Sequence, residues 1–102
     1  MTPELRIRVR QELKTGMRIR IGDMAATVEE VGPPENLRTW KYYTGQDNGE
    51  LIETLRKSQV TCCAMLAFDE EIKRLFIIEW RNYWWSLVGK MRLDLHILKP
   101  PQ

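Results

Sequence analysis

The chain has 102 residues, of which 43% are hydrophobic and 29% charged, and its formal net charge is +2 at pH 7. This composition is that of a folded globular domain, a single one over residues 1–102, and it excludes an intrinsically disordered chain. The apolar runs are shorter than the roughly 18 residues that cross a bilayer, and residues 1–10 contain no apolar stretch of a secretion signal. We therefore expect a cytoplasmic protein with no membrane partner.

Two segments near the N-terminus alternate strictly between apolar residues and arginine. Residues 5–10 read LRIRVR, and residues 17–21 read MRIRI. Alternation with a period of two is typical of a half-buried strand. A turn over residues 13–16 separates these two predicted strands, and Gly22–Asp23 turns the chain into a third, over residues 26–31.

Residues 13–31, LKTGMRIRIGDMAATVEEV, resemble the opening of SH3-like small β-barrels. These barrels often begin with a Leu-Lys-x-Gly turn, an alternating strand, a glycine-containing turn and a strand of the type (Gly/Ala)-Thr-Val-x-x-Val. The usual glycine before the Thr-Val pair is Ala26 here. The resemblance implies a small barrel. It selects no function, because such barrels bind proteins, peptides and nucleic acids alike.

The middle of the chain predicts a strand, a helix and a strand in that order. After the break at Pro33–Pro34, residues 39–43 fit a short strand. Residues 49–57 predict a helix, because acidic residues lie in the first turn, basic residues in the last turn and apolar residues on one face. The continuous apolar run over residues 60–68 predicts a buried strand.

Residues 69–88 fit two different structures. As strands, residues 75–80 and 83–88 would form a hairpin that bends at Arg81–Asn82; as one helix, the whole segment would place its apolar residues on a single face. The β-branched and aromatic residues favour the strands. The predicted fold is therefore α+β, a twisted antiparallel sheet or small partly open β-barrel with one helix near residues 49–57. A second long helix over residues 69–88 is the alternative.

The arginines of the first two predicted strands form the sharpest charge pattern. If these strands pair, five arginines share one face of the sheet: Arg6, Arg8, Arg10, Arg18 and Arg20. Like charges opposite each other destabilise a sheet, so this face needs counter-charges. They could come from Glu29, Glu79 or Asp94 within the fold, from an acidic protein surface, or from the phosphates of a nucleic acid.

A dense aromatic cluster supplies the candidates for an interface or a ligand site: Trp80, Tyr83, Trp84 and Trp85. If this segment is a strand, Tyr83 and Trp85 lie on one face of the sheet and Trp84 on the other. The two adjacent indoles then need two different covers. The covers on offer are the core, the helix over residues 49–57, a second subunit and a bound ligand.

Catalytic and metal-binding patterns are nearly missing from the sequence. The single histidine, His96, and the adjacent Cys62 and Cys63 are too few and too poorly spaced for a metal site, and no phosphate-binding loop is present. We predict no cofactor, no metal and no catalytic residues. The expected function is a non-enzymatic interaction module that forms a homodimer through its aromatic surface. The alternatives are a nucleic-acid-binding module that uses the arginine face, and small-molecule binding under the aromatic cluster.

Overall fold

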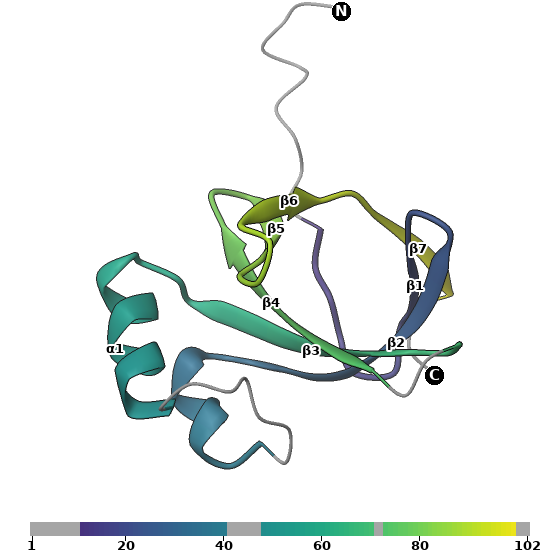
Figure 1. Ribbon diagram of the computed structural model, residues 1–102. Coiled ribbons are helices and arrows are strands. Elements are labelled where there is room, and N and C mark those ends of the chain that lie inside the picture. Colours follow the sequence, from purple (N-terminus) through teal and green to yellow (C-terminus); the bar gives the residue numbers. More distant parts are fainter. Residues whose placement is uncertain (1–10, 41–47, 71–72, 100–102) are drawn as a thin grey trace, which may run out of the picture.

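The computed structural model describes residues 11–40, 48–70 and 73–99. In this part of the chain the elements follow one another as β1 (Arg18–Ile21), β2 (Met24–Gly32), the 3-10 helix η2 (Pro34–Arg38), α1 (Asn48–Lys57), β3 (Cys62–Phe68), β4 (Arg74–Trp80), β5 (Tyr83–Ser86), β6 (Met91–Leu93) and β7 (Leu95–Lys99) (Figure 1).

The strands of the described residues form one antiparallel sheet in the order β6-β5-β4-β3-β2-β1-β7. Its two outermost strands, β6 and β7, are consecutive in the chain and are separated only by Asp94. The sheet therefore curls until its two ends come together at that residue, which gives the curled half-barrel seen in Figure 1. The predicted antiparallel, sheet-rich α+β architecture with one helix near residues 49–57 is confirmed at this level.

Two tight hairpins set the register of the sheet. Gly22 has a φ of +59° at the first loop position between β1 and β2. In the loop between β4 and β5, Arg81 has a φ of +53° and Asn82 a φ of +69°. Positive φ angles at both loop residues are what a type I′ turn requires, and its twist matches that of the flanking strands. The predicted bend at Arg81–Asn82 is confirmed, and the alternative of one helix over residues 69–88 is wrong.

The central strands of the sheet carry a hydrophobic core on each face. Inside the curl lies one core, made by Leu13, Met17, Ile19, Ala26, Val28, Ala64, Leu66, Ile77, Trp84 and Leu95. Outside it, a second core joins the sheet to α1 and η2 and contains Leu37, Leu51, Ile52, Leu55, Val60, Cys63, Met65, Phe76 and Ile78. Because successive residues of β3 and β4 point into different cores, both strands carry apolar residues on both of their faces.

The short strand predicted over residues 39–43 does not begin where expected. Thr39 follows η2 as its C-cap, and Trp40 is outside any strand. Trp40 packs edge-on against Phe76, with 6.2 Å between ring centroids, so it covers the outer face of the sheet instead of extending an edge. Residues 41–43 lie outside the described residues, as does the strand predicted over residues 5–10.

A substitution in the inner core tests this architecture. Ile77 is fully buried in the inner core, whereas Val88, in the turn after β5, is 88% exposed. Ile77→Ala should lower the free energy of unfolding by about 2–5 kcal/mol, because it leaves a cavity among packed neighbours. Val88→Ala should change it by less than about 0.5 kcal/mol. Urea unfolding of both variants measures the difference, and equal losses would contradict the inner core.

Candidate functional site

The hairpin of β4 and β5 separates the two adjacent tryptophans. Trp84 points into the inner core, where it is 2% exposed, and its Nε1–H donates a hydrogen bond of 2.8 Å to the carbonyl oxygen of Gln11. Trp85 is half-buried on the outer face, where its Nε1–H donates to the carbonyl oxygen of Trp80 at 3.1 Å. The rings of Trp80 and Trp85 meet edge-to-face, with centroids 5.6 Å apart. Trp84 is therefore covered by the sheet itself, and Trp85 is the indole whose cover is incomplete.

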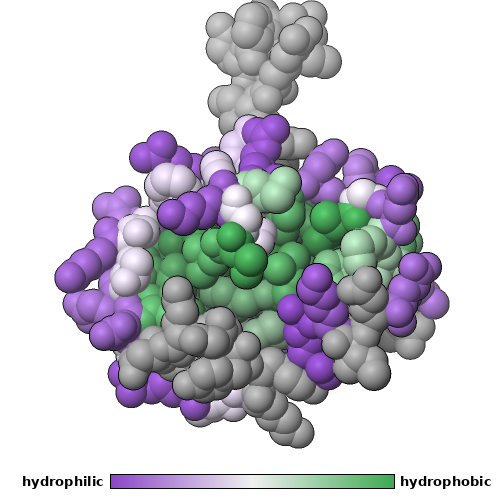
Figure 2. Space-filling model, viewed as in Figure 1, coloured by the Kyte–Doolittle hydropathy of each residue, from purple (hydrophilic) through white to green (hydrophobic). Residues whose placement is uncertain are grey.

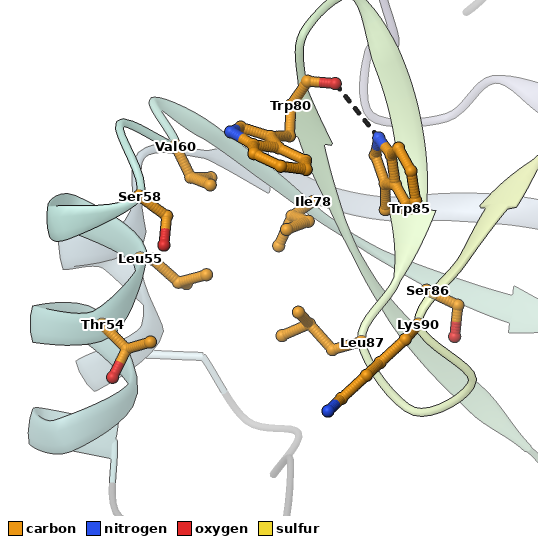
Figure 3. Close-up of a pocket in the computed structure, with 10 residues that line it drawn as sticks. All are labelled: Thr54, Leu55, Ser58, Val60, Ile78, Trp80, Trp85, Ser86, Leu87 and Lys90. Carbon is orange, nitrogen blue, oxygen red and sulfur yellow. Dashed lines mark hydrogen bonds between the residues drawn. The ribbon is translucent and has the colours of Figure 1, made fainter.

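A cleft of about 300 Å³ opens between α1 and the β4–β5 hairpin beside these rings (Figure 3). Its apolar walls are made by Leu55, Val60, Ile78, Trp80, Trp85 and Leu87. Figure 2, in the orientation of Figure 1, shows hydrophobic side chains gathered in the middle of the viewed face and framed by hydrophilic ones. An apolar space that opens to solvent is a feature of binding sites rather than of ordinary protein surface.

Three polar side chains lie at the border of the cleft. Thr54 and Ser58 contribute from the α1 side, and Lys90 contributes from the turn between β5 and β6. The Thr54 hydroxyl donates to the carbonyl oxygen of Glu50 at 3.0 Å. The Lys90 side chain extends past Leu87 toward α1 (Figure 3), and within the described residues no carboxylate forms an ion pair with it. The cleft thus combines apolar walls with one cation.

Two arginines, Arg81 at the tip of the β4–β5 hairpin and Arg92 on β6, stack on aromatic rings. The guanidinium carbon of Arg81 lies 4.4 Å from the centroid of Trp80, and that of Arg92 lies 4.5 Å from the centroid of Tyr83. In each of these cation–π contacts, an arginine of the same chain covers one face of the aromatic ring. Of the four aromatic candidates, the structure therefore brings Trp80, Tyr83 and Trp85 together on the outer face and places Trp84 inside.

The arginine candidates are only partly within the described residues. Arg18 forms a paired contact with the carboxylate of Asp69, with Nη1 2.6 Å from Oδ1 and Nη2 on Oδ2, and its Nη1 also donates to the Thr27 hydroxyl at 2.7 Å. Arg20 is exposed and lies opposite Ala25 on one side and His96 on the other. Arg6, Arg8 and Arg10 lie outside the described residues.

Strand β1 pairs on both of its edges with strands of the described residues. Both edges of β1 are taken, one by β2 and one by β7, so the pairing with residues 5–10 on which the five-arginine face depended is not formed by β1. The counter-charge of Arg18 is Asp69, a residue of the β3–β4 connection that local sequence does not link to β1. Of the three expected acidic partners, Glu29 pairs with Arg74 at 2.6 Å and Asp94 lies 3.5 Å from His96. The third, Glu79, is buried.

The adjacent cysteines point to opposite sides of β3. Cys63 is buried in the outer core, and Cys62 packs beside the inner one. Burial raises the pKa of the Cys63 thiol to about 12, with smaller contributions from Cys62 and Glu35. A thiol that stays protonated at neutral pH is a structural residue rather than a nucleophile. In the described ranges no cluster of three or more His, Cys, Asp or Glu side chains could hold a metal ion.

Comparisons with known proteins give no relative from which a function could be inferred, so the function is argued from the geometry of the site. No protein-family model, curated protein sequence or solved structure matches this chain. In the described part of the chain, α1 is too short to span a bilayer, and no other helix is long and apolar enough to do so. Sequence reasoning singled out Trp80 and Trp85 but missed Lys90. The only hint of Lys90 in the sequence is its place in a turn after Gly89, and that place does not reveal that the turn lies opposite α1.

The contact between Arg18 and Asp69 predicts a pH-dependent contribution to stability. The hydrogen bond from Arg18 lowers the pKa of Asp69 below its usual value of about 3.9. A carboxylate with a lowered pKa stabilises the fold fully above that usual value, and the contribution is lost as the pH falls through the lowered one. Asp69→Asn should therefore destabilise the protein at pH 7, and the difference from wild type should shrink below about pH 4.

Unfolding by urea at a series of pH values measures this difference. The control is Asp23→Asn, because Asp23 is exposed in the β1–β2 turn and forms no ion pair with the described residues. If the stability difference from wild type changes with pH in the same way in both variants, the contact with Arg18 is not the cause of the pH dependence.

Proposed function

We propose that this protein is a non-enzymatic binding module that holds an apolar group of its partner in the cleft between α1 and the β4–β5 hairpin. The observation that carries the proposal is the incomplete cover of Trp85. The ring is half-buried beside about 300 Å³ of open apolar space. This volume is at the lower end of the range of small-molecule pockets, about 300–1,000 Å³.

The stability of the fold offers no reason for this space to stay open. Burial of apolar surface stabilises a fold by about 25 cal/mol for each Å², and a surface left in water does not contribute this free energy. A larger residue at Thr54 or Ser58, both exposed on the α1 side, could occupy part of the cleft without disturbing the core. Small hydroxyl residues at these two positions instead keep the tryptophan wall accessible, which supports a binding role.

The nucleic-acid alternative has less support among the described residues. Arg18 is already engaged by Asp69, and the outer rings of Trp80 and Tyr83 are each stacked with an arginine of the protein itself. A base would have to displace that arginine before it could stack. An SH3-like assignment of the barrel, proposed from residues 13–31, is compatible with either role, because such barrels bind partners of several classes.

Self-association is a second candidate, favoured by one observation. In the turn after β5 and the strand that follows, Val88 is 88% exposed and Met91 58% exposed. Two large apolar residues exposed so near in sequence are typical of a surface that another protein covers. We propose that a second copy of this chain covers them, in a homodimer formed next to the aromatic surface.

Light scattering of the purified protein tests the homodimer. Wild type should have the mass of a dimer at roughly 100 μM, and Val88→Glu should have that of a monomer, because the dimer would bury an unpaired carboxylate. Glu53→Gln, a change at an exposed residue of α1 that does not line the cleft, should leave the dimer intact. A wild-type monomer at that concentration would rule the dimer out.

A cleft-filling variant tests the main proposal. Nile red, a neutral dye that brightens in apolar sites, should bind wild type, and Thr54→Phe should weaken this binding by at least about ten-fold because the new ring occupies the cleft. Glu53→Phe is the matched control, since Glu53 is the preceding exposed residue of α1 and does not line the cleft. Both variants should keep the melting temperature of wild type. No dye binding by wild type, or equal binding by both variants, would contradict the proposal.

A further inference from the structure

We infer that the ligand of the cleft is a small carboxylic acid, an apolar body with one carboxylate, which places its body against Trp85 and its carboxylate on the ammonium group of Lys90. This inference rests on the proposed function, because it names the class of ligand that the same cleft takes.

The walls of the cleft specify the apolar body. Both tryptophans on the wall present ring surface, and the polar end of Trp85 is already used, because its N–H donates to the carbonyl oxygen of Trp80. The remaining wall residues, among them Ile78 and Leu87, have no polar side-chain atoms. Ser86 turns its hydroxyl away from the cleft (Figure 3). Apart from the Nε1–H of Trp80, the wall offers no side-chain donor or acceptor, so a ligand group that needs several hydrogen bonds would lose them there, whereas an aromatic or branched alkyl group would not.

The position of Lys90 specifies the charge. Its side chain reaches along the open side of the cleft toward α1 (Figure 3), and no carboxylate of the described residues neutralises it. Lys90 has a φ of +49°, in the left-handed region that glycine or asparagine adopts at lower cost. A lysine kept in an unfavourable backbone conformation beside an apolar cleft points to a role for its ammonium group.

The number of cations distinguishes a carboxylate from a phosphate. Lys90 is the one charged side chain that lines the cleft within the described residues, and no arginine contributes to the lining. Phosphate groups are typically held by several donors, such as an arginine fork or a cluster of backbone N–H groups. One ammonium group matches one carboxylate. The polar Thr54 and Ser58 lie at the border from which water can keep the ion pair partly hydrated.

Calorimetric titration with two matched probes tests the inference. The probes are 2-naphthaleneacetate and 2-naphthaleneacetamide, which share one apolar body and differ in charge. Wild type should bind the acid roughly five-fold more tightly than the amide, which is the size expected of a partly exposed ion pair. Lys90→Gln should remove this preference, because the acid loses its ionic partner. Lys57→Gln should keep the preference, because Lys57 is exposed at the end of α1 and does not line the cleft.

The outcomes separate this inference from the proposed function. Equal binding of acid and amide by wild type, or a preference that survives Lys90→Gln, overturns the inference while the cleft remains a binding site. If wild type binds Nile red but neither probe, the inference is overturned and the cleft remains a binding site. If wild type binds neither the probes nor Nile red, the proposed function is overturned as well. A pentapeptide with a free C-terminal phenylalanine that binds over ten-fold more tightly than the acid would overturn the small-acid assignment in favour of a chain end.

Discussion

The whole arrangement depends on a sheet that must be covered on both faces. Along β3 and β4, consecutive apolar residues point alternately inward and outward, so one layer of packing cannot bury them all. The curl of the sheet buries the inward set against itself, and α1 with η2 buries the outward set. Adjacent Trp84 and Trp85 are the clearest instance, because the same alternation sends one indole into each core.

The cleft exists because the outer face of the sheet is covered less completely than the inner face. The curl is drawn together where Asp94 joins β6 to β7, and Gln11 links β7 to β5 by donating to the Leu95 carbonyl while accepting from Trp84. The inner core is therefore enclosed. On the outer face one helix of ten residues covers only part of the sheet, and the hairpin side of that face stays accessible. The open apolar space and the neighbouring Lys90 are what the helix leaves uncovered.

Sequence reasoning was strongest where local chemistry decides the structure. The predicted helix over residues 49–57 and the bend at Arg81–Asn82 depended on charge order, periodicity and the period-two pattern of the flanking residues, all of which act over a few positions. It failed over residues 39–40, where Trp40 is drawn onto the sheet by the ring of Phe76. It left the neighbours of β1 open, because the alternation of residues 17–21 marks a strand without naming the strand beside it; the structure pairs β1 with β2 and β7.

The sequence by itself determined that Trp84 and Trp85 could not share a core, since adjacent side chains of a strand point to opposite faces. It also predicted a sheet-rich α+β fold with a helix near residues 49–57, and the described residues confirm both. Only the tertiary structure decided which indole is enclosed, that Asp69 neutralises Arg18, and that Lys90 lies opposite α1. These facts depend on how far the sheet curls and where the helix packs against it. Both are set by contacts between residues tens of positions apart, which no local pattern records.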